Sequence, residues 1–576
     1  MAAKPFESRI QDLVYNVDVG IGARLIKGTL YVLFISFIIL LYTANQFRGL
    51  RDAEAMDYAQ LGRNFMEHRQ LITQNVRPAS IWYLTRSPDE TDPRIHGHPD
   101  IVHAPLYPVM LGTWFRIPGM QFDALPDGPL NIYQPERRIM YLNHLFAIFT
   151  GLLLYLVGRR LFDARVALLG VTIYFLSDMV WRDSLSGTGV TIAAFWAIAA
   201  VYAMLIAVSR IEESADTRRW MVPALVSLAF CVLAFLTRYA AVALVPGLAL
   251  YLGLALKQRG WVWGPVFIAL FLVAVSPWFA RNIAVSGAPL GLAPHMALND
   301  TTLFAENSFE RSLNPNLEGQ GVAGVLQTKS LKNFHRFYQE NLRTIGEGLL
   351  ICIFFTTFFY RFVRSPVHTL RWCLALSIAL FLLIASFYGD ATFRLIVMFW
   401  PFIILYALAF FFLLLERMQL QVKIMNMAVT GALIILSALP MIFTLLPPRA
   451  TIPYPPYAPQ MIMYVSNLLR PNELMCTDMS WATAWYGRQT SVLLPYNIEE
   501  FYDINDYMHR FSGLYFTNLT RNQPYARTLR SSRYVTWLPI LEGRIPGDFP
   551  LTQGIPLRDM ENIFLSDRAR WAEEAP

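Results

Sequence analysis

Long apolar stretches recur along this chain, separated by segments rich in polar residues. A helix needs roughly 20 apolar residues to cross a bilayer, so each stretch of about that length predicts a membrane span. The stretches lie near residues 29–46, 139–158, 165–181, 187–209, 220–237, 240–256, 262–280, 344–363, 370–388, 392–415 and 425–446. The pattern predicts a mainly α protein, a polytopic membrane helix bundle of about 11 spans.

Basic residues alternate with the apolar stretches in a way that predicts the orientation of the chain. If the N-terminus is cytoplasmic, every inner segment carries lysine or arginine, as the positive-inside rule requires. These residues are Lys4, Arg9, Arg24, Lys27, Arg159, Arg160, Arg165, Arg210, Arg218, Arg219, Lys257, Arg259, Arg361, Arg364, Arg371, Arg417 and Lys423. An odd number of spans then places the C-terminus outside. The first apolar stretch is expected to be an uncleaved anchor.

Three larger polar segments are expected on the outer side, near residues 47–138, 281–343 and 447–576. The third begins with closely spaced prolines, which cannot continue a helix and indicate a stiff linker. Beyond it the pattern becomes that of a small α/β domain. Helices are predicted at 460–469, 481–486 and 498–507, and strands at 474–477, 491–494, 513–519 and 532–537. We therefore predict a transmembrane domain at 1–446 and a soluble domain at 447–576.

The composition supports this class of protein. Hydrophobic residues make up 55% of the 576 residues and charged residues 15%, against roughly 25% charged residues in soluble domains. The net charge of +7 comes from short loops between apolar stretches, so it indicates membrane topology and not nucleic-acid binding. Of the four cysteines, Cys231, Cys352 and Cys373 lie in or beside apolar stretches. No disulfide framework or cysteine-rich metal site is indicated.

Three carboxylates, Asp52, Glu54 and Asp57, follow the first apolar stretch directly. They do not all occupy one face of a helix, because neighbours on a face lie three or four residues apart. The flanking residues predict an interfacial helix that begins here, with Asp52 near its N-terminus. Two interpretations remain open, a capped and solvated first turn or a carboxylate with a chemical role.

The same outer segment contains a histidine-rich and proline-rich run. Its histidines are His96, His98 and His103. This spacing is not diagnostic of zinc, and the intervening Pro99 disfavours a regular metal site. The following run at 104–108 is expected to bring a rigid aromatic segment back to the membrane surface, close to Asp52 and Glu54.

Several arginines lie at predicted outer ends of helices, where the positive-inside rule gives no reason for them. They are Arg182, Arg238, Arg281 and Arg394. Any one of them could extend toward lipid headgroups. Together they predict guanidinium groups opposite the carboxylates of the first outer segment, and the guanidinium fork suits phosphate recognition.

An outer cavity with arginines and a carboxylate suits a lipid-linked phosphosugar as substrate. Its phosphate lies at the level of the headgroups and its apolar tail lies in the membrane. Arginines would hold the phosphate as it leaves, and a carboxylate would take the proton of the attacking hydroxyl. The absence of a Walker or dinucleotide glycine motif agrees with a reaction that uses no nucleotide.

A series of short motifs resembles the GT-C class of polytopic glycosyltransferases, and specifically its family 39-like branch of protein O-mannosyltransferases and aminoarabinose transferases. The first two are similar to the family's Asp-Glu-x-x-Tyr-Ala and Lys/His-Pro-Pro-Leu-Tyr elements. The motifs lie at residues 52–59, 103–108, 158–162, 236–238, 277–282 and 394–401. The resemblance covers roughly residues 30–450, and it rests on the order and topological placement of the motifs.

This resemblance implies an inverting glycosyltransferase of the hexosyl or pentosyl type. It would move a sugar from a polyprenyl-phosphate donor to an envelope glycolipid, glycan or protein, on the periplasmic face of a bacterial inner membrane. By register Glu54 aligns with the family's catalytic aspartate, and Asp52 is the alternative base. The expected substrate-binding residues are Asp57, Tyr58, His103, Tyr107, Arg238, Arg281 and Arg394. His103 stands where the family often has lysine.

No cofactor is assigned by the sequence and no metal ligand is predicted, although Asp52, Glu54 and Asp57 could supply oxygen ligands to a divalent cation. The expected partners are the donor lipid, the bilayer and an envelope acceptor, with no nucleic acid. A transporter or flippase of lipid-linked glycans is one alternative, but no polar series crosses the apolar stretches. A non-catalytic envelope scaffold is the other, and it would not need the outer arginines.

Overall fold

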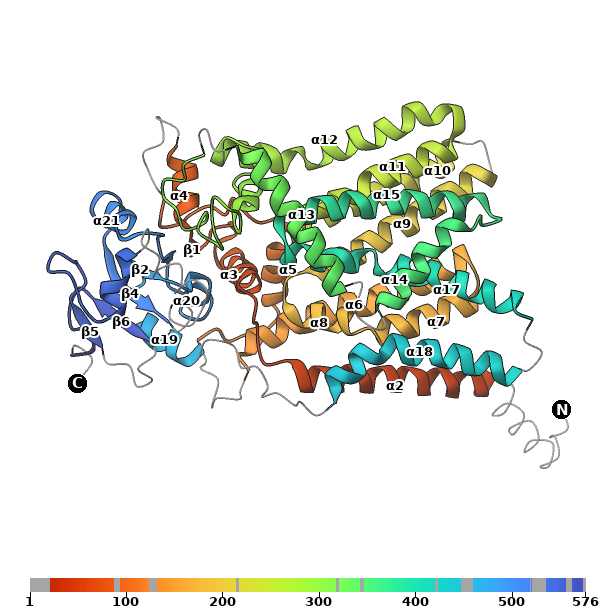
Figure 1. Ribbon diagram of the computed structural model, residues 1–576, viewed down its shortest axis with the longest axis horizontal. Helices are drawn as coiled ribbons and strands as arrows, with labels where there is room; N and C mark the ends of the chain where they lie inside the picture. Colours follow the sequence, from red (N-terminus) through yellow and green to blue (C-terminus); the bar gives the residue numbers. More distant parts are fainter. Residues whose placement is uncertain are drawn as a thin grey trace, which may run out of the picture.

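The computed structural model describes residues 21–86, 94–123, 132–213, 217–317, 321–341, 347–419, 423–446, 459–517, 520, 535–555 and 562–572. Long helices form a bundle, and a smaller domain with a β-sheet lies at one end of it (Figure 1). The first described helix, α2 (Ile21–Gln46), begins at the opposite end of the bundle (Figure 1). The long helices therefore run between the end of the bundle that carries the β-sheet domain and the opposite end.

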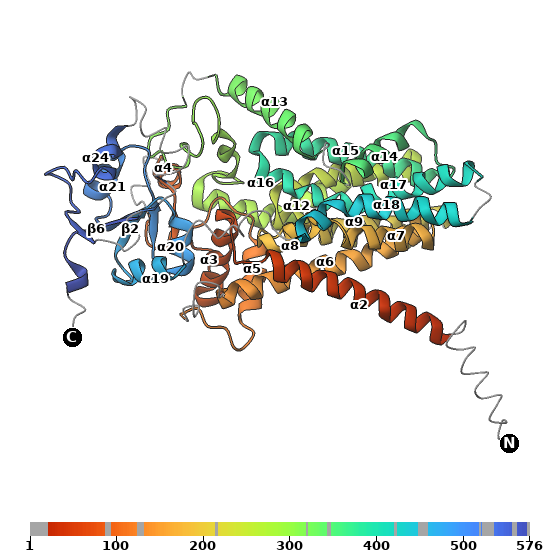
Figure 2. The same ribbon diagram turned by 60° about the horizontal axis from the view of Figure 1, so that its bottom comes forward.

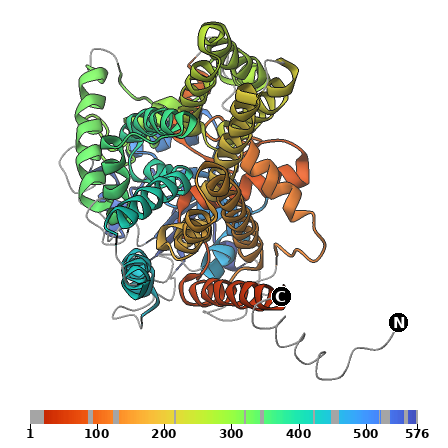
Figure 3. The same cartoon turned by 90° about the vertical axis from the view of Figure 1, so that its right-hand side faces the viewer.

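The bundle consists of helices with few charged residues. They are α2 (Ile21–Gln46), α6 (Gln134–Leu161), α7 (Ala164–Phe175), α8 (Asp178–Ser186), α9 (Val190–Glu213), α10 (Thr217–Thr237), η1 (Tyr239–Ala243), α11 (Leu244–Ala255), η2 (Lys257–Arg259), α12 (Gly260–Ser286), α14 (Glu347–Thr356), η4 (Thr357–Phe359), α15 (Ser365–Tyr388), α16 (Asp390–Phe393), η5 (Arg394–Met398), α17 (Trp400–Arg417) and α18 (Lys423–Leu445). Seen along the bundle axis, α2 lies at the periphery (Figure 3), and its apolar window is only 11% buried. Its side chains are therefore free to face lipid.

Within the described residues, eight helices are long and apolar enough to cross a membrane, or nine if α7 and α8, bent by 53°, form one span. The predicted count of 11 is therefore not confirmed. The difference lies in two stretches, near 240–256 and 344–363, which form the shorter apolar helices Tyr239–Ala255 and Glu347–Phe359. Hydropathy finds an apolar run but does not say whether the helix within it is long enough to cross.

The outer segments supply the elements around the site. They are α3 (Ala53–His68), β1 (Asn75–Val76), α4 (Pro78–Thr85), α5 (Leu106–Phe115), η3 (Ala293–Leu298) and α13 (Val322–Asn341). The interfacial helix expected after the first span is α3, which lies between the bundle and the outer domain (Figure 2). The proline-rich run leads into α5 as expected, and α5 packs on α3, with the rings of Tyr58 and Tyr107 5.2 Å apart.

Two glycines allow α3 and α5 to pack this closely. A Cβ added to Gly112 would lie 2.6 Å from the carbonyl oxygen of Gly62, and one added to Gly62 would lie 2.7 Å from Cβ of Leu111. Any larger residue at these positions would push the two helices apart. The pair of glycines thus sets the distance between the carboxylate-bearing helix and the proline-rich segment.

The outer domain contains α19 (Pro459–Asn467), β2 (Leu474–Thr477), α20 (Ser480–Tyr486), β3 (Ser491–Leu493), α21 (Ile498–Tyr507), β4 (Phe511–Phe516), η6 (Val535–Trp537), α24 (Leu538–Leu541), β5 (Gln553–Ile555), β6 (Ile563–Ser566) and η7 (Arg570–Ala572). The sheet order is β1-β3-β2-β4-β6-β5, with parallel pairing from β1 to β4 and antiparallel pairing of β5 and β6. The predicted helices near 460–469, 481–486 and 498–507 are present, as are the strands near 474–477, 491–494 and 513–519.

The strand predicted at 532–537 is wrong over Val535–Trp537, which form a 3-10 helix, and 532–534 lie outside the described residues. Pro539, in the first turn of α24, favours a helix start at this point. Trp537 is fully buried and donates from its indole nitrogen to the carbonyl oxygen of Pro495 at 3.2 Å. Trp537 is thus buried from a 3-10 turn and not from a strand.

The outer domain is joined to the first outer segment by shared structure. Strand β1 pairs with β3, so residues 75–76 complete a sheet whose other strands begin almost 400 residues later. The buried guanidinium of Arg63 on α3 donates to the carbonyl oxygens of Ala484 and Trp485 at 2.8 Å. The buried carboxylate of Glu136 accepts hydrogen bonds from Trp485 and Tyr486. Helix α20 is therefore attached to both α3 and α6.

Candidate active site

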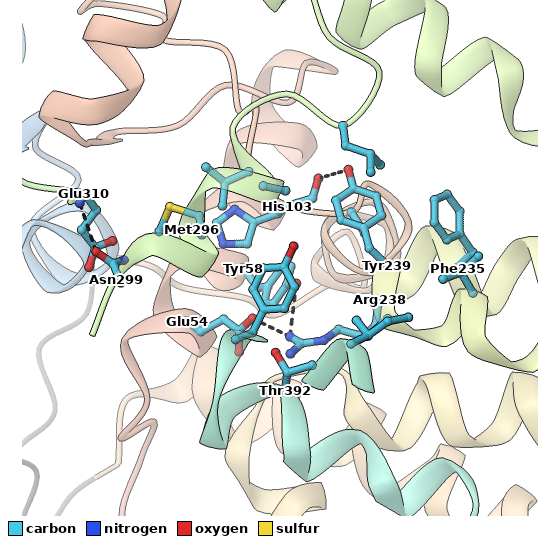
Figure 4. Close-up of a pocket in the computed structure, with 18 of the residues that line it drawn as sticks. Glu54, Tyr58, His103, Phe235, Arg238, Tyr239, Met296, Asn299, Glu310 and Thr392 are labelled. Carbon is cyan, nitrogen blue, oxygen red and sulfur yellow. Dashed lines mark hydrogen bonds and ion pairs between the residues drawn. The ribbon is translucent and has the colours of Figure 1, made fainter. Parts of the chain in front are cut away.

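A cavity of about 620 Å³ lies where α3 meets the membrane bundle and the outer domain. Its two ends differ in character (Figure 4). One end is apolar and is formed by side chains of the bundle, including Phe235, Phe271, Phe279 and Ile384. The other end is polar and is formed by α3, the outer segments and α20. A molecule with a polar head and an apolar tail would match both ends.

Glu54 and Arg238 form an ion pair on the wall of this cavity. Nη1 of Arg238 donates to Oε1 of Glu54 at 2.6 Å, and it also lies 3.3 Å from the hydroxyl of Tyr58 and 3.4 Å from the carbonyl oxygen of Thr188. Glu54, Tyr58 and Arg238 all line the cavity. Within the described residues, Nε and Nη2 of Arg238 have no hydrogen-bond partner. The guanidinium thus keeps one donor edge for a ligand.

Asp52 lies outside the lining of this cavity. It occupies the N-cap position of α3, but its side chain makes no capping hydrogen bond. Its carboxylate instead accepts from Nη1 of Arg394 at 2.7 Å, and both side chains are partly exposed. Asp52 therefore occupies the predicted position at the start of the helix, but without the hydrogen bond of a capping side chain.

Asp57 is buried behind the cavity wall. It accepts from Nη2 of Arg77 at 2.5 Å, from Nδ2 of Asn75 at 3.0 Å and from Nε2 of Gln60 at 2.9 Å. Nε2 of His103 lies 3.5 Å from its carboxylate. Since Arg77, Asn75 and His103 line the cavity and Asp57 does not, Asp57 is placed to orient lining residues.

His103 lines the cavity and is oriented by Asp100. Its Nδ1 lies 3.0 Å from Oδ1 of Asp100, and its ring contacts that of Tyr58 at 4.8 Å. Burial opposes the charged form of His103, but the two nearby carboxylates raise its pKa above the ordinary value. Burial likewise opposes ionisation of Asp100, but the charge of His103 and its hydrogen bond hold the pKa of Asp100 below its usual value. The pair therefore favours imidazolium and carboxylate.

Tyr107 and Arg281 lie close to the cavity without lining it. The buried hydroxyl of Tyr107 donates to the carbonyl oxygen of Gly187 at 2.8 Å. Nη1 of Arg281 donates to the carbonyl oxygen of Asp100 at 2.6 Å, and its guanidinium lies over the ring of Trp278. Both residues thus support the outer segments. Arg182 is exposed and lies 3.7 Å from Asp178.

Three charged residues at the site were not identified from the sequence. Arg77 links Asp57 to Glu310, with its Nε 3.2 Å from Oε2 of Glu310. Asp100 orients His103. Because Asp100 lies only three residues before the histidine, the sequence could have indicated this pair. Arg77 and Glu310 lie 233 residues apart in irregular outer segments, where no periodicity marks them.

The described residues contain no group of three or more histidine, cysteine, aspartate or glutamate side chains that could hold a metal ion. The three histidines of the histidine-rich run point to different partners. His98 contacts the hydroxyl of Ser80, His96 contacts His509, and His103 contacts Asp100. They do not form a cluster.

Residues 132–280 match the family model described as dolichyl-phosphate-mannose-protein mannosyltransferase. No curated protein sequence matches the chain. The archaeal oligosaccharyltransferase AglB from Archaeoglobus fulgidus, in complex with an inhibitory peptide and a dolichol-phosphate, is similar in structure. That match has a TM-score of 0.55 and 11% identity, and it covers 96% of this chain and 75% of that chain.

ArnT from Cupriavidus metallidurans in the apo state is also similar. The TM-score is 0.52 at 11% identity, and the match covers 96% of this chain and 99% of that chain. A third match is the Archaeoglobus fulgidus oligosaccharyltransferase tethered with an acceptor peptide, at a TM-score of 0.53 and 12% identity, covering 94% of this chain and 74% of that chain. In fold this chain resembles the GT-C class of polytopic glycosyltransferases, and residues 132–280 place the resemblance on the family 39-like branch.

Proposed function

We propose that this protein is a glycosyltransferase that moves a sugar from a polyprenyl-phosphate donor to an envelope acceptor on the periplasmic face of a bacterial inner membrane. The observation that carries the proposal is the ion pair of Glu54 and Arg238, 2.6 Å apart, on the wall of a cavity with an apolar end. The apolar end suits a polyprenyl tail, and the ion pair lies where the phosphate and the sugar would meet.

In the proposed reaction Glu54 is the general base. Its carboxylate takes the proton of the acceptor hydroxyl while that oxygen forms a bond to the anomeric carbon of the sugar. The bond from the anomeric carbon to the phosphate oxygen breaks on the opposite side, and its electron pair leaves with the polyprenyl phosphate. The free donor edge of Arg238 and the imidazolium of His103 stabilise the charge of the departing phosphate.

The geometry favours Glu54 over Asp52 as the base. Glu54 lines the cavity, whereas Asp52 is held outside it by Arg394. Asp57 is buried and engaged by three donors, so it suits a supporting role. Tyr58, His103 and Arg238 are the proposed contacts of the donor. Tyr107, Arg281 and Arg394 are proposed to keep these contacts in place.

A transporter or flippase of lipid-linked glycans is the competing proposal. Such a protein would need polar groups along a path across the bundle. The pairs formed by Asp52, Glu54 and Asp57 instead gather at the start of α3, and α3 lies at the end of the bundle that carries the outer domain (Figure 2). A non-catalytic scaffold would not need the cavity.

The test compares Glu54→Gln and Asp52→Asn in the full-length protein, reconstituted in lipid vesicles with a panel of polyprenyl-phosphate hexoses and pentoses. The assay measures release of polyprenyl phosphate, which follows transfer to either an acceptor or water. Glu54→Gln is expected to lower turnover by roughly 10²- to 10⁴-fold, the usual contribution of a general base. Asp52→Asn and the exposed control Glu67→Gln should remain within about tenfold of wild type. If Glu54→Gln and Asp52→Asn both leave turnover intact, the proposed mechanism is wrong.

The orientation of the chain is tested separately. Reporter fusions that fluoresce only in the cytoplasm should be active at the N-terminus and inactive at the C-terminus. Activity at the C-terminus would place the cavity on the cytoplasmic face and would rule out a periplasmic acceptor.

A further inference from the structure

The polar end of the cavity extends past the ion pair to a wall contributed by three separate parts of the chain. The residues on this wall are Asn75, Asn299, Glu310, Trp481 and Leu493. Asn299 and Glu310 lie on the side of the cavity opposite Phe235 (Figure 4). The proposed phosphate and base positions lie between this wall and the apolar end, so the wall is the place for whatever the phosphate carries.

Hydrogen-bonding groups on this wall are held in place yet incompletely used. The side-chain oxygen of Asn299 accepts from the backbone N–H of Glu310 at 3.2 Å, and Oε2 of Glu310 accepts from Arg77. Within the described residues, Nδ2 of Asn299, Oε1 of Glu310 and the indole N–H of Trp481 have no hydrogen-bond partner. The wall thus offers two donors and one acceptor beside an aromatic ring.

Trp481 is presented by a short helix that cannot easily move. Arg63 holds the last turn of α20 through the carbonyl oxygens of Ala484 and Trp485. At the first turn, the hydroxyl of Ser480 donates to Oδ1 of Asn75 at 2.6 Å. Trp481 is partly exposed and lines the cavity, whereas Trp485 is fully buried in the core. The outer domain therefore contributes one aromatic side chain to the site.

We propose that Asn299, Glu310 and Trp481 form a subsite for a pyranose ring, an inference that rests on the proposed function. A pyranose has an apolar face that packs on an aromatic ring and hydroxyls that both donate and accept hydrogen bonds. Glu310 would accept from a hydroxyl, Asn299 would donate to another, and Trp481 would cover the apolar face. The outer domain thereby takes part in choosing the sugar.

The test measures binding of two sets of probes to the full-length protein in lipid vesicles. The first set is undecaprenyl phosphate and its glucose, mannose and galactose derivatives, which probes the donor sugar. The second set is the free methyl pyranosides and a lipopolysaccharide core oligosaccharide, which probes an acceptor sugar. The variants are Trp481→Ala, Asn299→Ala and Trp481→Phe, with the exposed Tyr507→Ala on the same domain as the control.

Trp481→Ala and Asn299→Ala are expected to weaken binding of at least one sugar-bearing probe about tenfold, the effect of losing about 1.4 kcal/mol. Binding of undecaprenyl phosphate itself should stay within about twofold of wild type, and Trp481→Phe should retain most of the sugar affinity. A loss confined to the first set identifies a donor sugar, and one confined to the second set identifies an acceptor sugar. The subsite is refuted if the variants bind all probes like wild type. It is also refuted if wild type binds no sugar-bearing lipid more tightly than undecaprenyl phosphate and shows no binding of the free sugars above the buffer blank. Failure of wild type to bind undecaprenyl phosphate would instead refute the proposed function.

Discussion

Replacing Arg63 with methionine should release the outer domain from α3. The Arg63 side chain is only 1% exposed, and it donates to the carbonyl oxygens of Ala484 and Trp485 and to Oε1 of Gln74 at 2.6–2.8 Å. Methionine keeps much of the length and apolar packing of the side chain but removes all three hydrogen bonds. The two carbonyl oxygens would be left buried without these donors.

The size of the effect follows from these contacts. Hydrogen bonds to a charged donor contribute about 1.5–3 kcal/mol each, and each orphaned buried carbonyl costs about 1–3 kcal/mol. The substitution also removes the desolvation cost of a buried guanidinium, whose Nε has no partner within the described residues, and this offsets part of the loss. The net destabilisation of the contact between α20 and α3 should be about 2–4 kcal/mol, the cost of two orphaned carbonyl oxygens less this offset.

Hydrogen exchange of backbone amides, followed by mass spectrometry, measures this loss locally. A destabilisation of about 3 kcal/mol should speed exchange in peptides that contain α20 by roughly 10²-fold. Peptides from β6, on the far side of the sheet, and the exposed control Arg137→Met should change little. Unchanged exchange of α20 in Arg63→Met would show that Arg63 does not hold the outer domain to α3.

The remaining predictions concern protonation, helix packing and metals. Because the pKa of His103 is raised, its charged form contributes fully to folding stability below about pH 6.5. This contribution is lost as the pH rises through the raised pKa. Affinity for the lipid phosphate, measured by titration with undecaprenyl phosphate, should fall over the same window, and Asp100→Asn should move the fall to lower pH. A curve that stays flat from about pH 6, just below the ordinary value, to about pH 10 would contradict this. Gly112→Ala should cost about 1–3 kcal/mol in thermal unfolding, since its Cβ would meet the backbone of Gly62, whereas Gly324→Ala, with open space around it, should cost nothing. Chelation with EDTA should leave release of polyprenyl phosphate unchanged, because Asp52, Glu54 and Asp57 each face a different arginine; loss of activity that Mg²⁺ or Mn²⁺ restores would show that a metal is needed.

The bundle was accessible from the sequence because its signal is local. Each apolar stretch can be recognised from its own residues. What local hydropathy cannot give is length in the folded state. The stretch near 240–256 begins as a 3-10 helix directly after Arg238, whose backbone is extended and whose guanidinium pairs with Glu54, 184 residues away.

The site was only partly accessible for the same reason. Arg238 was identified because it lies at a predicted helix end, and Glu54 because it lies in a motif that resembles a known family. The structure brings the two side chains together. Arg77 and Glu310 carry no such mark, and their pairing joins two irregular segments. Strand β1 is two residues long, too short for an alternating pattern, and only its partner β3 reveals it.

Of the three carboxylates at the start of α3, Asp57 differs from the other two in its own exposure, whereas Asp52 and Glu54 differ in the exposure of their arginine partners. Asp57 is 1% exposed and does not line the cavity, so this carboxylate is part of the interior, and of the pair Arg77 alone lines the cavity. Asp52 and Arg394 are 30% and 41% exposed, so water screens them and their pairing adds little stability. Glu54 is 31% exposed, but its partner Arg238 is only 8% exposed. A base must be reachable by the acceptor while its position is set by a rigid neighbour, and of the three only Glu54 meets both conditions on the wall of the cavity.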